Sequence, residues 1–236
     1  MKKPATSSKS APNVLVIDIG GTNVKVLATG QKEARKTPSG KTMTPQLMVD
    51  AVKKMAGDWK YDRVAIGYPG PVEKGQIAKE PHNLAPGWIG FDFAAAFNCP
   101  VKVINDAAMQ ALGSYKTGSM LFLGLGTGLG SALVIEGILV PLELAHLPYG
   151  KGTYEDYLGI RGVERMGKKK WRKHVDFCVE RLTAAFQLSD VVLGGGNVKK
   201  LKELPKNCRE GDNANAFIGG FRLWESDAGR KRSNAK

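Results

Sequence analysis

The chain contains the same local pattern twice. In "NVLVIDIGGTNVKVLATG" (residues 13–30), an apolar run ends in a Gly/Thr turn, a second apolar run follows, and a glycine closes the segment. The segment "SMLFLGLGTGLGSALVIEG" (residues 119–137) repeats this order. Such a repeat predicts two related halves, each opening with a β-hairpin whose turn carries no bulky side chain.

The remaining segments alternate between strand and helix patterns. Helical spacing is seen at 44–57, a strand entering a Pro/Gly loop at 63–72, and a strand passing into a helix at 101–115. The segment 190–201 reads as strand, glycine turn and helix, and residues 171–186 predict a helix that buries one face. The predicted buried face consists of Trp171, Val175, Cys178, Leu182 and Phe186.

This alternation predicts an α/β protein of two lobes with a ligand cleft between them. We expect the first lobe at residues 13–115, joined by a returning helix near 214–224, and the second lobe at 116–212. Basic tails are expected at 1–12, which we predict to be disordered, and at 225–236.

The first glycine turn, "DIGGTNVK", has the parts of a phosphate-binding loop without the spacing of a Walker A motif. Glycines allow backbone N–H groups to approach an anion closely, and Asp18 at the end of a strand can orient Mg²⁺ through water. An ordinary hairpin turn is the alternative. Two further turns, "GLGTGLGS" and "LGGGN" (193–197), favour phosphate binding. The candidate phosphate-binding residues are Asp18, Gly20, Gly21, Thr22, Asn23, Lys25, Gly126, Thr127, Gly128, Gly195 and Gly196.

Asp106, in "VINDAA", lies where an apolar strand passes into a helix. A carboxylate at this place can accept the proton of an attacking hydroxyl, as a general base does. It can equally be the N-cap of the helix, a frequent use of aspartate.

The loop "LELAHLPYGKGTYEDYLG" (142–159) carries Glu143, His146, Glu155 and Asp156. Carboxylates and an imidazole can hold sugar hydroxyls. A metal site is the alternative, but the loop contains no cysteine and no obvious third ligand. The pattern therefore favours a sugar.

Charge points to an anionic partner. The net charge is +13, and seven basic residues with no acidic one lie within 1–12 and 229–236. The densest internal cluster surrounds Trp171 and consists of Arg165, Lys168, Lys169, Lys170, Arg172 and Lys173. Cations are unfavourable at a helix N-terminus, by about 0.3–1 kcal/mol each, unless an anion binds there. A solvated surface run and a nucleic-acid site are alternatives. The latter is disfavoured because Trp171 alone could stack on a base and also belongs to the apolar stripe.

The N-terminal residues contain no apolar secretion signal, and no apolar run reaches the about 20 residues that span a membrane. The three cysteines are scattered. We therefore expect a reduced, cytoplasmic protein.

Taken in order, these motifs resemble the ROK family of sugar kinases and repressors. The matching elements are "DIGGTNVK", "GYPGPV", "HNLAPGW", "NDAA", "GLGTGLGS", "ELAH" and "LGGG". The resemblance implies a duplicated actin-like ATPase (ribonuclease H-like) fold with two lobes around a cleft, and a homodimer. It also implies Asp106 as the base. The sugar-binding residues it implies are Asn83, Asn105, Asp106, Glu143, His146 and Glu155, with Gly70 shaping the same side of the cleft.

The chain departs from the usual pattern of the family in two places, which limits the functions that the resemblance implies. The loop after the Glu-x-x-His element lacks the cysteines of the zinc loop found in most ROK proteins, so we predict no zinc. The residues before Asn13 leave no room for the helix-turn-helix of the repressors, so we predict no DNA binding. The segment from Glu143 to Val175 is similar to polyphosphate glucokinases. This similarity implies glucose as acceptor, Mg²⁺, and polyphosphate as donor, with ATP as a further donor. The predicted polyphosphate track is Lys168, Lys169, Lys170, Arg172 and Lys173.

Three hypotheses follow from the sequence. The first is a polyphosphate-dependent glucokinase, and the second is an ATP-dependent hexokinase of the same family. The third is a non-catalytic protein that binds polyanions or nucleic acid.

Overall fold

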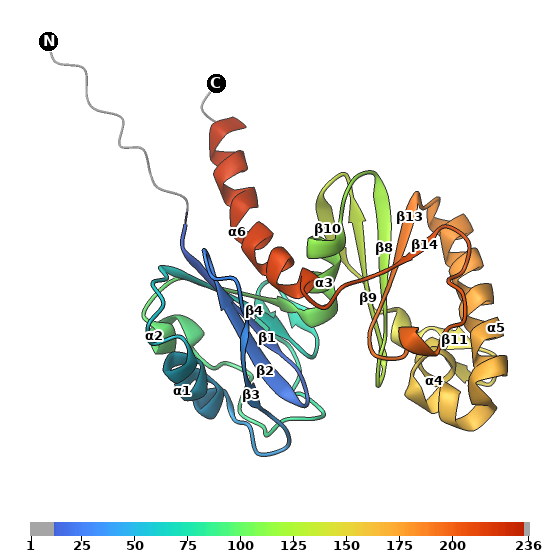
Figure 1. Cartoon of the computed structure of the whole chain (residues 1–236), viewed down its shortest axis with the longest axis horizontal. Coiled ribbons are helices and arrows are strands. Elements are labelled where there is room, and N and C mark those ends of the chain that lie inside the picture. Colours follow the sequence, from blue (N-terminus) through green and yellow to red (C-terminus); the bar gives the residue numbers. More distant parts are fainter. Residues whose placement is uncertain (1–11, 234–236) are drawn as a thin grey trace, which may run out of the picture.

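The structure, a computed structural model, describes residues 12–233 and contains two five-stranded sheets of identical topology (Figure 1). In each sheet an antiparallel three-stranded meander continues into two parallel strands. The first sheet has the order β3 (Arg35–Pro38), β2 (Asn23–Ala28), β1 (Val14–Ile19), β4 (Arg63–Tyr68) and β7 (Val101–Asn105). The second has the order β10 (Ile138–Pro141), β9 (Leu129–Ile135), β8 (Ser119–Leu125), β13 (Asp190–Gly194) and β14 (Cys208–Glu210). The repeat in the sequence is thus a repeat in topology.

Helices cover both faces of each sheet. Helices α1 (Pro45–Met55) and α2 (Phe93–Phe97) cover the outer face of the first sheet. Helices α4 (Tyr154–Leu158) and α5 (Ile160–Phe186) cover the outer face of the second. Between the two sheets lie α3 (Asp106–Ser114) and α6 (Asn215–Ser233) (Figure 1). Short elements complete the fold: β5 (Val72–Glu73), β6 (Gln76–Ile77), β11 (Pro148–Tyr149), β12 (Gly152–Thr153), η1 (Leu144–His146) and η2 (Val198–Lys200).

Helices α3 and α6 cross with their backbones in contact. A Cβ atom on Gly113 of α3 would overlap the carbonyl oxygen of Asn215, and one on Gly219 of α6 would overlap that of Met109. Around this crossing, α3 packs on the second sheet through Ala107, Ala108 and Ala111. Helix α6 packs on the first sheet through Ala216, Phe217 and Trp224. The last helix of the chain therefore completes the core of the first lobe.

Helix α5 is interrupted at Gly167. This residue has φ +74° and ψ 158°, a left-handed conformation that glycine adopts without a steric penalty. A new helical segment begins at Lys168, so Lys168, Lys169 and Lys170 form its first turn, and the helix begins three residues before the predicted start at Trp171. Trp171, Val175, Cys178 and Leu182 are buried, as predicted.

Three local predictions are wrong. Phe186, placed on the buried face, is 39% exposed because it is the last residue of α5 and lies past the edge of the core. The helix expected after the third glycine turn is only the single 3-10 turn η2, because the backbone becomes extended at Leu201. The returning helix continues to Ser233 instead of ending near 224.

Most of the predicted N-terminal tail, residues 1–11, and the last three residues of the predicted C-terminal tail lie outside the described residues. Within residues 12–233, no helix combines the length and the apolar composition required to cross a bilayer.

We predict that Gly219→Ala lowers the free energy of unfolding by about 2–3 kcal/mol, because the added methyl group forces α6 away from α3. Urea denaturation measures this change. The matched control is Gly57→Ala, whose Cβ would lie 3.4 Å from its nearest neighbour and should change stability little. Equal stability of the two variants would contradict the close helix crossing.

Candidate functional site

Two carboxylates meet at the carboxyl ends of the parallel strands of the first sheet. Asp18 of β1 lies opposite Gly67 of β4, and Gly67 lies opposite Ile104 of β7. Asp106 follows at the first position of α3. Gly67 contributes no side chain between them, and its Cβ position faces Met109 and the Cα of Asp106.

The charge of Asp18 affects the pKa of Asp106. Burial and, to a smaller extent, the neighbouring charge of Asp18 together raise the pKa of Asp106 to about 7, against hydrogen bonds that include the 2.8 Å bond from the backbone N–H of Ala107. Burial also raises the pKa of Asp18, whose side chain is 13% exposed, while Lys25 at 3.5 Å lowers it. A carboxyl group with a pKa near neutrality can accept and return a proton at physiological pH.

The N-cap of α3 is Asn105, one residue before Asp106. Its side-chain oxygen accepts a hydrogen bond from the N–H of Ala108 at 3.1 Å, and its amide donates to the carbonyl of Gly70 at 3.1 Å. The helix is therefore capped without Asp106, which removes the main alternative to a chemical role for that carboxylate. Asn105 also fixes the Pro/Gly loop at Gly70, so part of its predicted sugar-binding capacity is used within the protein.

Hydrogen bonds from backbone N–H groups and one hydroxyl fix the backbone of the first glycine turn. The N–H of Gly20 donates to the carbonyl of Asn23 at 2.9 Å, and Ser39 binds the carbonyls of both Gly20 and Thr22. Asn83 lies directly against Gly21. The loop that carries Asn83 therefore borders the predicted phosphate-binding turn.

The second and third glycine turns are joined to each other. Asn197 is 4% exposed, and its side-chain amide donates to the carbonyl of Gly126 at 2.7 Å. Its backbone N–H donates to Leu125 at 2.9 Å. The turn containing Gly195 and Gly196 thus lies against the turn of Gly126, Thr127 and Gly128. Gly130, where the second turn ends, packs on Ala107, next to Asp106.

Glu155 lies at the second glycine turn. Its Oε2 accepts a hydrogen bond from the N–H of Leu129 at 3.4 Å, and its Oε1 pairs with Arg161 at 2.5 Å. A Cβ on Gly128 would overlap this carboxylate. Glu143 and His146 are exposed, Glu143 as the N-cap of η1 and His146 as its last residue; η1 contacts α4 and β9. No contact in the described residues joins them to Asp106.

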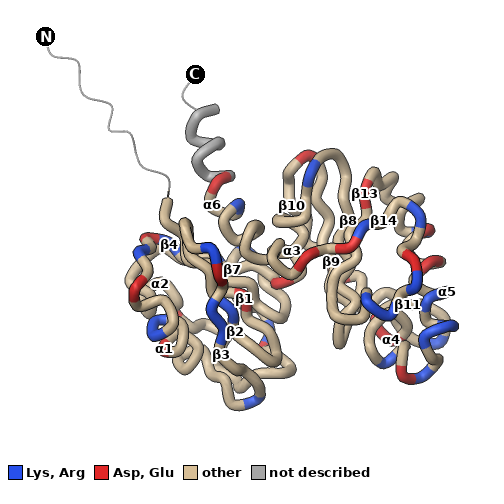
Figure 2. The backbone as a smooth tube through the Cα atoms, viewed as in Figure 1, with Lys and Arg blue, Asp and Glu red and all other residues tan. Residues whose placement is uncertain are grey.

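Basic side chains continue from the third turn to α5. Lys200 donates to the side-chain oxygen of Asn197 at 2.5 Å, and its own carbonyl accepts a 2.7 Å bond from Arg172. Arg172 stands one helical turn after Lys168 and Lys169, which are exposed. Figure 2 shows the basic residues gathered on α5 and its neighbours.

The donor set fits a hard divalent cation. Burial and the neighbouring charge of Asp18 raise the pKa of Asp106, and Lys25 lies 3.5 Å from Asp18. Mg²⁺ prefers carboxylate oxygens and retains several waters, so Asp18 suits it. Within residues 12–233, no three His, Cys, Asp or Glu side chains gather into a larger metal cluster. The absence of zinc stays a prediction.

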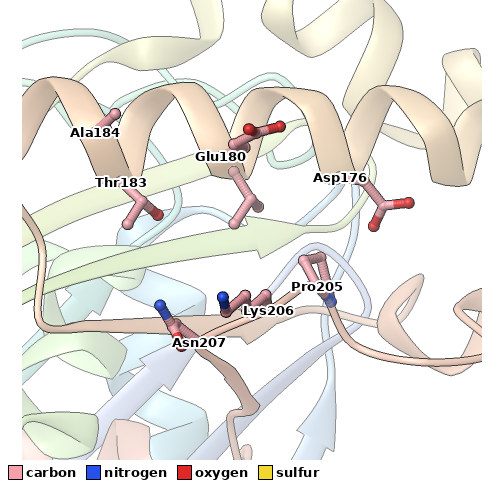
Figure 3. Close-up of a pocket in the computed structure, with 8 residues that line it drawn as sticks. Asp176, Glu180, Thr183, Ala184, Pro205, Lys206 and Asn207 are labelled. Carbon is pink, nitrogen blue, oxygen red and sulfur yellow. The ribbon is translucent and has the colours of Figure 1, made fainter.

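The hollow drawn in Figure 3 lies elsewhere, between the second half of α5 and the Pro205–Asn207 turn. None of the candidate residues lines it.

Comparison with known proteins places this geometry in a family. The model of the ROK family matches residues 14–141, from the first strand to the end of β10. The chain belongs to the ROK family.

Three proteins show which members of the family this chain is similar to in sequence or structure. A bifunctional enzyme NanE/NanK of Brucella melitensis is 33% identical over 150 residues, which cover 57% of this ROK protein and only 29% of the relative. A polyphosphate glucokinase of Mycobacterium tuberculosis is 26% identical over 206 residues, covering 78% of this chain and 77% of the relative. The crystal structure of an inorganic polyphosphate/ATP-glucomannokinase from Arthrobacter sp. strain KM superposes with a TM-score of 0.77 at 23% identity, covering 92% and 99% of the two chains. The fold is that of the actin-like ATPases, as the resemblance implies.

The sequence analysis did not identify Asn197 or Lys200 as site residues. An asparagine directly after three glycines is only a weak signal that its side chain binds another turn. The contact with Gly126 can be recognised only once β8 is known to pair with β13.

We predict that Asp106→Asn becomes increasingly more stable than wild type as pH rises from 5 to 8. The pKa of Asp106 is raised from 3.8 to about 7, so the folded chain retains a proton that the unfolded chain has released. The contribution of protonated Asp106 to the free energy of unfolding is therefore full below about pH 4 and is lost as pH rises through about 7. Melting temperatures of both proteins without Mg²⁺ measure it. A constant difference across this range would contradict the raised pKa.

Proposed function

We propose that this ROK protein transfers the terminal phosphoryl group of inorganic polyphosphate to the 6-hydroxyl of glucose, with ATP as a further donor. The observation that carries the proposal is the place of Asp106. This carboxylate has a pKa of about 7, is not needed as a helix cap, and adjoins elements that carry the first two glycine turns. The names of the glucokinase and glucomannokinase relatives support the same assignment.

In the proposed reaction, Asp106 accepts the proton of the 6-hydroxyl while that oxygen attacks the terminal phosphorus. A new oxygen–phosphorus bond forms, the bond to the next phosphate breaks, and a shortened polyphosphate or ADP leaves. Backbone N–H groups of the glycine turns hold the phosphate oxygens, and Lys25 adds a positive charge beside Asp18. Glu155, with Glu143 and His146, would hold sugar hydroxyls. Mg²⁺, when bound by Asp18, neutralises charge on the donor phosphates.

Polyphosphate is favoured as donor by the continuity of the basic surface. The side-chain amide of Asn197 donates to Gly126 in the second turn, and the ammonium of Lys200 donates to the side-chain oxygen of Asn197. The guanidinium of Arg172 in turn donates to the backbone carbonyl of Lys200. Lys168 and Lys169 extend this line on the exposed surface of α5. A long phosphate chain that starts at the glycine turns can follow these cations, whereas a nucleoside triphosphate is too short to need them.

ATP-dependent hexokinase is the second candidate, and one observation favours it. A hollow lined by Glu210, Gly211, Asp212 and Asn213 adjoins the third turn, where Gly211 donates to the carbonyl of Leu193 at 2.9 Å. Carboxylates beside such a turn can accept hydrogen bonds from ribose hydroxyls. A homodimer, a cytoplasmic location and the absence of DNA binding remain proposals.

We predict that wild type forms glucose 6-phosphate with Mg²⁺ and polyphosphate, and that Asp106→Asn lowers kcat by about 10²–10⁴-fold. A coupled assay run in parallel with polyphosphate and with ATP measures this. Binding of polyphosphate should persist in the variant, since the glycine turns and lysines are unchanged. Activity with ATP alone would select the second candidate. Undiminished activity of the variant would contradict the assignment of the base. Anion binding without turnover in wild type would favour the non-catalytic hypothesis.

We further predict that the double variant Lys168→Glu/Lys169→Glu weakens polyphosphate binding. By analogy with nucleic-acid phosphates, the slope of log affinity against log salt should become shallower by about one for each phosphate that a lysine no longer neutralises. Acidic side chains at the first turn of a helix are favourable, so unfolding should not account for the weaker binding. Fluorescence titration at several salt concentrations measures it. The matched control is Lys53→Glu/Lys54→Glu on α1, which changes the net charge equally. Equal slopes for both variants would show that the α5 cluster is not the track.

A further inference from the structure

An aromatic cluster fills the space between the β11–β12 hairpin, α4 and α5. Tyr149 of β11 lies at its centre, with ring centroids 5.2 Å from Tyr154 and 4.8 Å from Tyr157, the latter at a 90° edge-to-face angle. The ring of His174 from α5 lies 5.6 Å from Tyr149 and 5.0 Å from Tyr157. Aromatic pairs of this geometry contribute about 0.5–1.5 kcal/mol beyond their buried area.

The hydroxyl of Tyr149 connects the hairpin to α5, where it interacts with the side chains of His174 and Cys178. The hydroxyl of Tyr149 lies 2.8 Å from Nδ1 of His174. Burial raises the pKa of Tyr149, and burial together with the charge of Arg165 lowers the pKa of His174. The hydroxyl therefore keeps its proton near neutral pH and the imidazole is neutral, which suits a bond from Tyr149 to an accepting Nδ1.

Helix α4 depends on this cluster for its position. A five-residue helix has no independent stability, so its place is set by its contacts. Tyr157 of α4 packs on both Tyr149 and His174, and Gly150 lies against its hydroxyl. The next residue, Leu158, accepts a hydrogen bond at its carbonyl from the indole N–H of Trp171 at 3.0 Å. Tyr154, at the start of α4, also packs on Tyr149, so Glu155 lies between two residues of α4 that contact Tyr149.

We propose that Tyr149 and His174 are positioning residues that hold α4, and thereby the carboxylate of Glu155, against the second glycine turn. Glu155 reaches the N–H of Leu129 at 3.4 Å from this helix, so a small shift of α4 would break that hydrogen bond. The proposal rests on the proposed function, in which Glu155 holds a sugar hydroxyl. We expect a shift of α4 to weaken sugar binding without weakening donor binding, because the contact between the basic residues Arg172 and Lys200 does not involve α4.

Three substitutions test the hydrogen bond. Tyr149→Phe removes the hydroxyl and keeps the ring. His174→Leu removes the acceptor, whereas the side-chain oxygen of His174→Asn occupies nearly the position of Nδ1 and can accept the same bond. Tyr115→Phe is the matched control, because it removes a hydroxyl that donates at 3.2 Å to the carbonyl of Gly118, outside the cluster.

We expect Tyr149→Phe and His174→Leu each to raise the KM for glucose about five-fold, with the KM for the donor unchanged and kcat lowered less. His174→Asn should restore most of the wild-type value, and Tyr149→Phe/His174→Leu should be no worse than either single variant. Tyr115→Phe should match wild type. Equal changes in both KM values, no rescue by asparagine, or additive effects would overturn the proposal.

A second measurement does not need activity. A double-mutant cycle on the free energy of unfolding should show coupling between Tyr149 and His174 whatever the protein phosphorylates. Calorimetric titration of glucose into wild type then tests the proposed function separately. Coupling without glucose binding would overturn the proposed function and leave the hydrogen bond standing, whereas glucose binding without coupling would overturn the positioning role alone.

Discussion

The close crossing of α3 and α6 determines how the two lobes are arranged. The pair of helices fills the space between the two sheets, with α3 packed on the second sheet and α6 on the first. Their contact is close enough to require glycine at Gly113 and Gly219. Because α3 begins at Asp106 and touches both sheets, the crossing also fixes where the proposed base stands relative to both hairpin turns. The architecture and the chemistry therefore depend on the same contact.

The two halves share a topology and have diverged in chemistry. In the first hairpin, Asp18 faces Lys25 across the strand pair, one step before the turn. In the second hairpin, the corresponding pair, one step before the last, is Gly124 and Gly130. The charged pair of the first half thus corresponds to two glycines in the second, where Gly130 lets Ala107 of α3 pack on the strand and Gly128 leaves room for Glu155.

Features that depend on local sequence could be predicted. The repeated hairpins, the buried face that begins at Trp171, and a carboxylate at the start of α3 all follow from periodicity and from strand–turn–helix order. Features that depend on distant segments could not. The clasp of Asn197 on Gly126 and the bond of Tyr149 to His174 join residues 71 and 25 positions apart. The short η2 was missed because a glycine turn followed by lysines also fits a helix, and the extended backbone at Leu201 that ends it has no signal in the sequence.

The indole of Trp171 has a consequence for spectroscopy. It is the only tryptophan between residues 116 and 212, it is fully buried, and it hydrogen-bonds to the carbonyl that ends α4. It also directly follows the three lysines that open the second segment of α5. The second lobe thus contains a single tryptophan, and we expect its emission to change when the contact between α4 and the second segment of α5 changes.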